Sequence, residues 1–375
     1  MNATSAVYHE AHQGKWRGKR FVVMAGGTGG HVYPALALAQ ALREQGADIT
    51  WLGNAKGFEY AKVTAAGFDF CSIEVRGLRG RGWKDTLTAP FMLAKALWQT
   101  RNHFRRLKPD AVVGFGGFVS GPGGLVARWL GIPLFIHEQN AIFGLTNRVL
   151  SYFAKRVMLG YAIDSVDLKH GIVTGNPVRQ DIQNLPEPAK RFMERDGAVR
   201  LLVLGGSQGA QALNRVLPQA LALLSPQERP EVLHQIGAGN SLEEVQSAYA
   251  QAGVTAQVVP YIENMAEAYG QADWVLARSG ALTVAEIATV GIGAVFVPFP
   301  TAVDDHQTAN AQTLANVGAA EVIAQSALSA ERLAEAIKAR QTRANLLAQA
   351  QAARALSQAQ ALAKIMETMQ VALHS

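Results

Sequence analysis

Two glycine-rich segments, 179 residues apart, constrain the fold of this chain more than any other feature. Gly26-Gly-Thr-Gly-Gly-His31 follows the apolar run Arg20–Ala25, and Gly205-Gly-Ser-Gln-Gly209 follows Arg200–Leu204. Each segment leads into an Ala- and Leu-rich stretch with helical character. A strand that turns through glycines into a helix points unpaired N–H groups and the positive helix end at an anion. Two such turns predict two nucleotide-type domains that face each other across a cleft.

Strand-like and helix-like segments alternate along both halves of the chain. Strands are predicted at 20–25, 48–52, 110–115, 132–137, 200–204, 231–236, 256–259, 273–277 and 293–298. Helices are predicted near 32–45, 57–66, 88–107, 122–130, 144–153, 210–224, 241–252, 263–269, 281–290 and 305–317. This alternation is typical of an α/β fold with parallel sheets and right-handed crossovers.

A proline-containing segment divides the two halves. Gly175-Asn-Pro-Val-Arg-Gln180, followed by Pro186 and Pro188, predicts a linker between a domain at 1–175 and a second at 176–355. Residues 1–18 are interpreted as a loose extension. The tail from residue 327 is rich in Ala, Gln and Leu and predicts helix. Its apolar spacing leaves open whether the last part, about 356–375, packs back onto the first domain.

Length and composition limit the class of protein. The 375 residues suffice for two domains that each bury a core. The single cysteine, Cys71, excludes an intrachain disulfide framework and fits a reducing cytoplasm. The first 19 residues lack the apolar region of a signal peptide, and no apolar run approaches the roughly 18–20 residues that span a bilayer. We therefore expect a soluble protein or one that lies on a membrane surface.

Positive charge is concentrated in the first half. Residues 1–175 hold 21 Lys and Arg against 11 Asp and Glu, whereas the remainder holds 14 against 18. The segment 76–108 alone has nine basic residues and one acidic residue. Such a segment faces an anionic partner or solvent.

Aromatic and apolar residues alternate with these basic ones. They are Trp83, Leu87, Phe91, Leu97, Trp98 and Phe104. Leu87, Phe91, Ala94 and Trp98 share one helical face. One interpretation is that this face packs on the sheet. The other is a basic and aromatic surface that rests on anionic lipid headgroups. Nucleic acid is not expected as a partner, because no nucleic-acid-binding module accompanies the charge.

Three motifs of the first half follow strand ends, where open α/β sheets bind ligands. His31 begins a helix after the first glycine turn; it acts either as a base or as a simple helix cap. Gly114–Gly124 has six glycines in eleven residues and is either a flexible wall of the cleft or a long surface loop. The four side chains of His137–Asn140 suit sugar hydroxyls, and they lack the spacing of metal ligands.

The second half offers groups for a diphosphate and a ribose. Ser207 and the N–H groups around it suit a diphosphate. Glu286, in the first turns of the helix after Arg278-Ser-Gly280, either stabilises the helix dipole or grips both ribose hydroxyls. In Asp304-Asp-His-Gln307, which is also a candidate helix cap, Gln307 is expected to reach a sugar.

Eight of these motifs, in register over about residues 19–320, resemble the MurG family of bacterial lipid II synthases. They are Gly26–His31, Gly116–Gly124, His137–Asn140, Gly144-Leu-Thr-Asn147, Gly175–Arg179, Gly205–Ala210, Arg278–Glu286 and Asp304–Gln307. The resemblance implies a GT-B fold, with two Rossmann-like, doubly wound parallel-sheet domains. It implies transfer of N-acetylglucosamine from UDP-GlcNAc to the 4-hydroxyl of lipid I, a polyprenyl-linked N-acetylmuramoyl-pentapeptide, in peptidoglycan synthesis.

The same resemblance implies the residues of the site. From the first domain, the residues that line the donor and acceptor side are Thr28, Gly29, Gly30 and Asn140. From the second, the residues that hold UDP-GlcNAc are Arg179, Ser207, Ile262, Ala281, Leu282, Thr283, Val284, Ala285, Glu286 and Gln307. Residues predicted to act in catalysis are His31 and Glu286. Phe118 stands where some family members carry tyrosine.

The implied chemistry is inverting glycosyl transfer with His31 as the base and no metal or cofactor. The segment 76–108 would then contact the anionic cytoplasmic face of the bacterial inner membrane, where other cell-wall synthesis proteins are possible partners. Three alternatives stay open. They are a related GT-B enzyme such as a UDP-GlcNAc 2-epimerase, a nucleotide-sugar-binding protein without turnover, and an NAD-dependent oxidoreductase. The last is disfavoured because neither glycine turn has the dinucleotide spacing.

Overall fold

The computed structural model describes residues 14–75, 83–163, 171–193, 195–206, 210–237, 239–300 and 305–375, and of 83–88 the backbone alone. These residues form two compact units. One comprises the chain up to Pro177 together with Gln360–Ser375, and the other comprises Val178–Ala359. The C-terminal segment therefore belongs to the first unit, where helix α16 (Ala361–His374) packs on helix α2 (Gly29–Glu44).

The first unit is built on a seven-stranded sheet in which every ladder is parallel. Its strands are β1 (Arg20–Met24), β2 (Asp48–Gly53), β3 (Asp69–Ser72), β4 (Ala111–Gly114), β5 (Leu134–Glu138), β6 (Arg156–Leu159) and β7 (Gly171–Val173). Their order is β3-β2-β1-β4-β5-β6-β7. Its other helices are α3 (Phe58–Ala65), α4 (Trp83–Leu107), α5 (Ser120–Leu130) and α6 (Leu145–Ser151).

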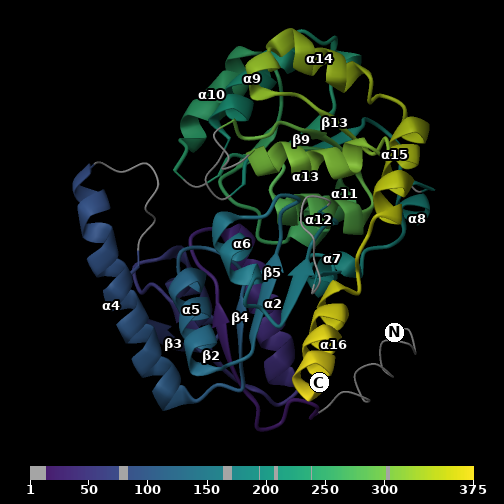
Figure 1. Cartoon of the computed structure of the whole chain (residues 1–375). Coiled ribbons are helices and arrows are strands. Elements are labelled where there is room, and N and C mark those ends of the chain that lie inside the picture. Colours follow the sequence, from purple (N-terminus) through teal and green to yellow (C-terminus); the bar gives the residue numbers. More distant parts are fainter. Residues whose placement is uncertain are drawn as a thin grey trace. The chain divides into compact units, whose positions relative to one another are not determined.

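Alternate residues of β1 enter two different cores. Phe21 and Val23 join the core that contains residues of α2 and α16, while Val22 and Met24 join the core that contains residues of α4, α5 and α6. Helices therefore cover both faces of the sheet, with α4 and α5 on one side and α2 and α16 on the other (Figure 1). This layering is that of a doubly wound α/β domain.

The second unit repeats the plan with a six-stranded parallel sheet. Its strands are β8 (Arg200–Leu204), β9 (Glu231–Gln235), β10 (Gln257–Val259), β11 (Trp274–Ala277), β12 (Gly293–Phe296) and β13 (Ala320–Val322), in the order β10-β9-β8-β11-β12-β13. Its helices are α7 (Gln180–Gln183), α8 (Pro188–Met193), α9 (Gln211–Ala222), α10 (Leu242–Gln251), α11 (Met265–Gln271), α12 (Ala281–Val290), α13 (His306–Ala315), α14 (Ala330–Lys338) and α15 (Arg343–Ala355). Single 3₁₀ turns lie at Pro226–Glu228 and Gln325–Ala327. Leu201 and Val203 of β8 pack with residues of α9, α10, α14 and α15.

The structure confirms two Rossmann-like units with parallel sheets, and it adds elements that the sequence did not predict. These are the outer strands β3, β6, β7 and β13 and the short helices α7 and α8. Each added strand has only three or four residues. Such short strands form because a neighbouring strand offers a ladder, and their own side-chain pattern is too brief to predict them.

Helix α4 decides between the two interpretations of the basic and aromatic segment. Its buried residues are Ala96, Thr100 and Phe104. Phe91 and Trp98 are instead 79% and 64% exposed. The interpretation that Phe91, Ala94 and Trp98 pack on the sheet is therefore wrong. Residues 76–82 and the side chains of Trp83 and Leu87 lie outside the part that the structure describes.

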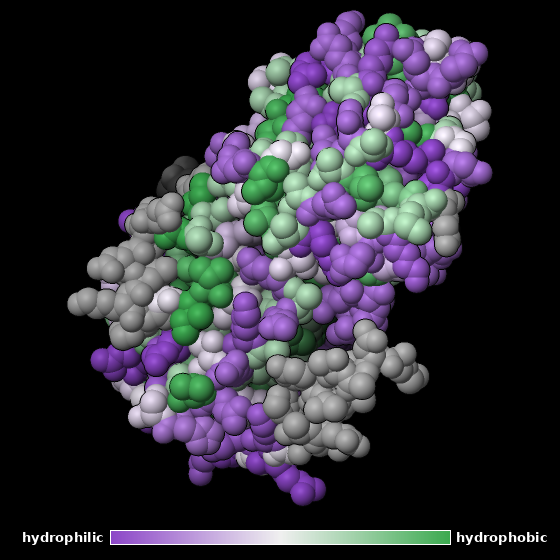
Figure 2. All heavy atoms as spheres, turned by 90° about the vertical axis from the view of Figure 1, so that its right-hand side faces the viewer, coloured by the Kyte–Doolittle hydropathy of each residue, from purple (hydrophilic) through white to green (hydrophobic). Residues whose placement is uncertain are grey.

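The described helices include no candidate membrane span. Within the ranges given above, no helix combines the length and the apolar composition needed to cross a bilayer. The face of the molecule presented in Figure 2 is mostly hydrophilic, and its hydrophobic side chains gather in small groups among hydrophilic ones.

Candidate functional site

Each sheet has a switch point where the chain's connections diverge to opposite sides. In the first unit this point lies between β1 and β4, and in the second between β8 and β11. The carboxyl ends of these strands are where open α/β sheets bind ligands. Four of the predicted motifs follow these four strands, namely Gly26–His31, Gly114–Gly124, Gly205–Gly209 and Arg278–Glu286. Both predicted sites thus begin at the position that the topology favours.

The first glycine turn is shaped by close approaches of backbone to backbone. Gly27 has a φ of +95° and Gly117 a φ of +79°, values that glycine adopts readily. A Cβ on Gly117 would lie 2.3 Å from the carbonyl oxygen of Gly26. The loop after β4 therefore packs directly on the loop after β1. The interpretation of Gly114–Gly124 as a long surface loop is wrong, because Gly114 ends β4, Ser120–Gly124 begin α5 and most of the segment is buried.

His31 stands in the first turn of α2, half-buried at the switch point. Its Nδ1 lies 3.2 Å from the carbonyl oxygen of Gly26. A carbonyl only accepts, so Nδ1 carries the proton and neutral His31 keeps its lone pair on Nε2. A Cβ on Gly116 would lie 3.2 Å from that Nε2, so the loop after β4 borders the basic nitrogen.

The neighbours of His31 present main-chain N–H groups. Thr28 is the N-cap of α2, and its side chain makes no capping hydrogen bond. The carbonyl of Thr28 accepts from the N–H of His31 and of Val32. Gly29 and Gly30 precede these residues, in the first turn, where N–H groups have no intrahelical acceptor. These three predicted residues form one anion-accepting end of α2.

The sugar-binding prediction for His137–Asn140 is wrong for its first three residues. His137, Glu138 and Gln139 are at most 2% exposed. The Nε2 of His137 donates to the carbonyl of Gly175 at 2.8 Å, and Gln139 donates to its Nδ1 at 3.1 Å. Burial lowers the pKa of His137 to about 4, so this imidazole is neutral. These side chains hold β5 to the segment at Gly175 and do not face a ligand.

Asn140 is the partly exposed member of that motif. Both its main-chain N–H and its Nδ2 donate to Oε1 of Glu138, each at 3.0 Å. The other oxygen of Glu138 accepts from the N–H of Gly144 and from Nδ2 of Asn147. The buried carboxylate therefore fixes Asn140 and the start of α6 together at the carboxyl end of β5.

The second glycine turn is described in part. Gly205 comes directly after β8 and lies close to the end of β9. A Cβ on Gly205 would lie 3.0 Å from the carbonyl oxygen of Gln235. Gly206 has a φ of +75°. The predicted phosphate-binding Ser207 lies outside the described residues, as do Gln208 and Gly209.

Helix α12 places the predicted run from Ala281 to Glu286 after β11. Gly280 is its N-cap and has no side chain to satisfy the first turn. The first intrahelical bond joins the N–H of Val284 to the carbonyl of Gly280. The N–H groups of Leu282 and Thr283 precede that bond and can serve an anion. Val284 is buried, and Ala285 is half-buried beside Glu286.

The carboxylate of Glu286 is held from two sides and is 20% exposed. The hydroxyl of Tyr269, a fully buried residue, donates to Oε2 at 3.1 Å. The guanidinium Nη2 of Arg179 lies 3.9 Å from Oε1. Burial raises the pKa of Glu286, and Arg179 and then Tyr269 act against that rise. The structure thus brings together two predicted site residues, Arg179 and Glu286.

Two further predicted residues lie at strand ends of the second unit. The backbone of Ile262, between β10 and α11, makes no hydrogen bond with the described residues. Gln307, in the first turn of α13, accepts from the N–H of Phe299 at 2.9 Å. Its Nε2 has no acceptor among the described residues. Asp304 lies outside them, and Asp305 adopts the left-handed conformation with a φ of +53°.

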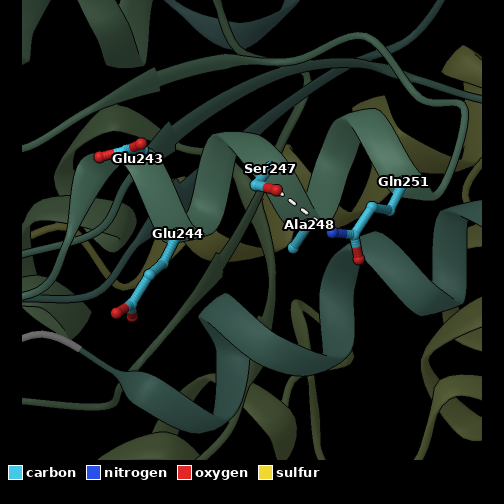
Figure 3. A pocket seen from close by; sticks show the side chains of 5 residues that line it. All are labelled: Glu243, Glu244, Ser247, Ala248 and Gln251. Atoms are coloured by element: carbon cyan, nitrogen blue, oxygen red, sulfur yellow. Dashed lines mark hydrogen bonds between the residues drawn. The ribbon is translucent and has the colours of Figure 1, made fainter.

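Neither a metal centre nor a second binding site emerges elsewhere in the described residues. They contain no group of three or more His, Cys, Asp or Glu that could hold a metal ion. A surface hollow of about 390 Å³ is lined by Glu243, Glu244, Ser247, Ala248 and Gln251, all of α10 (Figure 3). The two carboxylates point in different directions and Gln251 donates to Ser247, so no polar groups converge there.

Sequence reasoning missed two side chains that hold the site. Glu59 is 1% exposed and binds the first glycine turn, and Tyr269 binds Glu286. Both belong to short amphipathic helices, where a lone Glu or Tyr resembles any surface residue. A carboxylate two residues after Gly57, the last residue of Asn54-Ala-Lys-Gly57, was the only sequence signal for Glu59, and it was weak.

Two Rossmann-like units of this kind define the GT-B class of glycosyltransferases, and several solved glycosyltransferases share the fold. The crystal structure of Acinetobacter baumannii MurG matches with a TM-score of 0.81 and 40% identity, covering 94% of this chain and 99% of that one. The glycosyltransferase of kitacinnamycin, 16% identical, matches with a TM-score of 0.68 over 94% of this chain and 99% of its own, and shows the fold alone.

Comparison of sequences identifies the family. Residues 21–159 match the N-terminal domain of glycosyltransferase family 28, and residues 200–369 match its C-terminal domain. A Dichelobacter nodosus protein is 56% identical over 94% of this chain and 98% of its own length. It is named UDP-N-acetylglucosamine–N-acetylmuramyl-(pentapeptide) pyrophosphoryl-undecaprenol N-acetylglucosamine transferase. A Marinobacter nauticus protein of the same name is 50% identical over 85% of this chain and 88% of its own length. The chain therefore belongs to glycosyltransferase family 28.

Proposed function

We propose that this chain transfers N-acetylglucosamine from UDP-GlcNAc to the 4-hydroxyl of the N-acetylmuramoyl group of lipid I, with inversion, and so forms lipid II. The observation that carries the proposal is the 56% identity to the Dichelobacter transferase over almost the whole of both chains. The two switch-point sites support it, since one offers a base and the other offers groups for a nucleotide.

The second unit binds the donor. Glu286 accepts hydrogen bonds from the ribose hydroxyls, and the backbone of Ile262 pairs with the uracil edge. The N–H groups at the start of α12, with Arg179 and Ser207, face the diphosphate and stabilise the charge that develops as UDP leaves. The side chain of Gln307 reaches the sugar through its Nε2.

The first unit binds the acceptor and removes its proton. Nε2 of His31 takes the proton of the 4-hydroxyl as this oxygen attacks the anomeric carbon from the face opposite UDP. Thr28, Gly29, Gly30 and Asn140 line the path of the reacting sugars. The transferred proton stays on His31 until solvent removes it, and the route needs no metal ion.

An exposed aromatic surface on the first unit supports a peripheral location at the cytoplasmic face of the inner membrane. It consists of Phe91 and Trp98 of α4, Trp129 of α5 and Tyr152 at the end of α6, all at least 64% exposed. Helix α5 packs on both α4 and α6, and the guanidinium of Arg101 lies 5.1 Å from the ring of Trp129. Amphipathic aromatics next to basic side chains suit an anionic lipid surface.

Vesicle binding tests this surface. The double variant Phe91→Ser, Trp98→Ser is expected to lose most of its binding to anionic vesicles and to keep its affinity for UDP-GlcNAc. Met193→Ser, an 81% exposed residue of the second unit, is the matched control and is expected to change neither. Unchanged vesicle binding by the folded double variant would exclude the aromatic surface as the membrane contact.

Release of UDP from UDP-GlcNAc, with and without a soluble lipid I analogue, tests the activity. The transferase is supported by release that depends on the acceptor. Release without acceptor would indicate a hydrolase or an epimerase-like activity. Tight donor binding with no release would indicate a binding protein without turnover.

A further inference from the structure

We propose that Glu59 is a positioning residue that determines, through the Gly26–Gly27 peptide group, which ring nitrogen of His31 accepts a proton. The inference rests on the proposed function, in which His31 is the base. It assigns a role in this chemistry to a buried carboxylate that the proposed function does not use.

One peptide group connects the two side chains. Its N–H, on Gly27, donates to Oε2 of Glu59 at 3.4 Å, and its carbonyl, on Gly26, accepts from Nδ1 of His31 at 3.2 Å. The φ of +95° at Gly27 sets the plane of this peptide. Hydrogen bonds at the two ends of a peptide polarise each other, so the carboxylate strengthens the carbonyl as an acceptor. A stronger acceptor keeps the proton on Nδ1 and leaves the lone pair on Nε2.

The surroundings of Glu59 are built for a carboxylate. A Cβ on Gly26 would lie 2.8 Å from its Oε1, and a Cβ on Gly57 would lie 2.4 Å from its Oε2. Oε1 also accepts from the N–H of Asn54 at 2.9 Å. Within the described residues Glu59 has no ion pair. Main-chain N–H groups and the N-terminus of α3 therefore stabilise its negative charge. Burial of a carboxylate without a cationic side chain is costly, and the hydrogen bonds to Glu59 offset part of that cost.

In many catalytic sites a carboxylate bonds directly to the histidine and orients it. Here Glu59 has the same task, but a peptide group lies between the carboxylate and the imidazole. It moves no proton to Glu59. The imidazolium that forms when His31 accepts the proton is stabilised by the same carbonyl, because Nδ1–H then donates more strongly. A merely structural Glu59 would hold the loop without affecting which nitrogen of His31 is protonated.

The first test is nitrogen NMR of the imidazole in the full chain, with the His31 signals assigned from their loss in His31→Ala. The native protein is expected to show the Nδ1–H tautomer. Glu59→Gln is expected to shift His31 toward the Nε2–H tautomer, while Glu74→Gln, the same change at an exposed site of this unit, leaves it unchanged. An unaltered tautomer in folded Glu59→Gln overturns the proposal. This readout needs no turnover, so it is independent of the proposed function.

The second test is a double-mutant cycle on acceptor-dependent UDP release. Glu59→Gln is expected to lower kcat roughly tenfold with His31 present and to have almost no effect in the His31→Ala background. Equal losses in both backgrounds would overturn the proposal. If Glu59→Gln does not fold, Gly57→Ala replaces it, because the new Cβ displaces the carboxylate without removing it. The same tautomer shift is then expected, and its absence overturns the proposal.

Discussion

The two switch points hold their key side chains by different means. In the first unit, His31 is held by a main-chain carbonyl within a turn of glycines, whereas in the second, Glu286 is held by the buried hydroxyl of Tyr269 and by Arg179. Glycines allow two backbone segments to approach each other closely, but they have no side chains that could hold His31. The position of the imidazole therefore depends on the path of the loop. The carboxylate depends on two individual side chains. The same topology thus supports both the proposed proton-transfer site and the proposed nucleotide-binding site.

The largest effect is expected from His31→Ala, which removes the proposed base. The kcat for acceptor-dependent UDP release should fall by about 10²–10⁴-fold, the usual contribution of a general base. The affinity for UDP-GlcNAc, measured by calorimetry, should change little because the proposed donor-binding groups belong to the second unit. A loss of kcat below tenfold would place the base elsewhere and break the comparison.

Glu286→Ala tests the other side of the comparison. Loss of a charged hydrogen-bond acceptor for the ribose should raise the Kd for UDP-GlcNAc by roughly 10–100-fold. The kcat at saturating donor should fall much less. Glu243→Ala, on α10, is the matched control and should bind the donor normally. A large loss of kcat with unchanged donor affinity would contradict a binding role.

Acid unfolding sharpens the comparison, because the described part of each unit contains one buried neutral histidine. Burial lowers the pKa of His137 and of His234 to about 4 each. Between the unfolded pKa near 6.5 and this value the unfolded state binds more protons, so stability falls as the pH falls. Each histidine should cost about 3 kcal/mol once the pH is below 4. Thermal unfolding at pH 7, 5.5 and 4 measures this loss.

Variants assign the acid sensitivity to each unit. His137→Gln should weaken the pH dependence of the first unit, and His234→Gln that of the second, where the native imidazole bonds to Tyr249 and Asn214. Unfolding that is equally sensitive to acid in native protein and in both variants would rule out these histidines as its cause.

The smallest effect is expected from Tyr269→Phe. It removes one hydrogen bond to Glu286, so the Kd for UDP-GlcNAc should rise about tenfold or less. The hydroxyl lowers the pKa of Glu286, and its loss should raise that pKa further. As the pH falls, the variant should therefore lose donor affinity at a higher pH than the native protein does. Calorimetric titrations across pH provide the measurement, and an unshifted pH dependence would mean that Tyr269 serves only packing.

Much of the site follows from local sequence. Glycine turns after apolar strands predicted both switch points, and the helix start at Ala281 and the position of His31 at the start of α2 are as the pattern indicated. The predictions failed where burial decides. His137, Glu138 and Gln139 looked like ligand-binding groups, yet each bonds to protein groups in the interior.

The sequence by itself determined the α/β architecture, the two glycine turns and the family, because strand and helix periods and glycine spacing are local signals. Only the tertiary structure decided which polar side chains support the turns and which face of α4 is exposed. Glu59 and Gly27 are 32 residues apart in the sequence, and Tyr269 and Glu286 are 17 apart. Packing creates these contacts, and no local sequence pattern predicts them. Several faces of α4 carry apolar residues, so the sequence pattern alone does not show which face is buried. The packing of α4 on α5 decides which side is exposed.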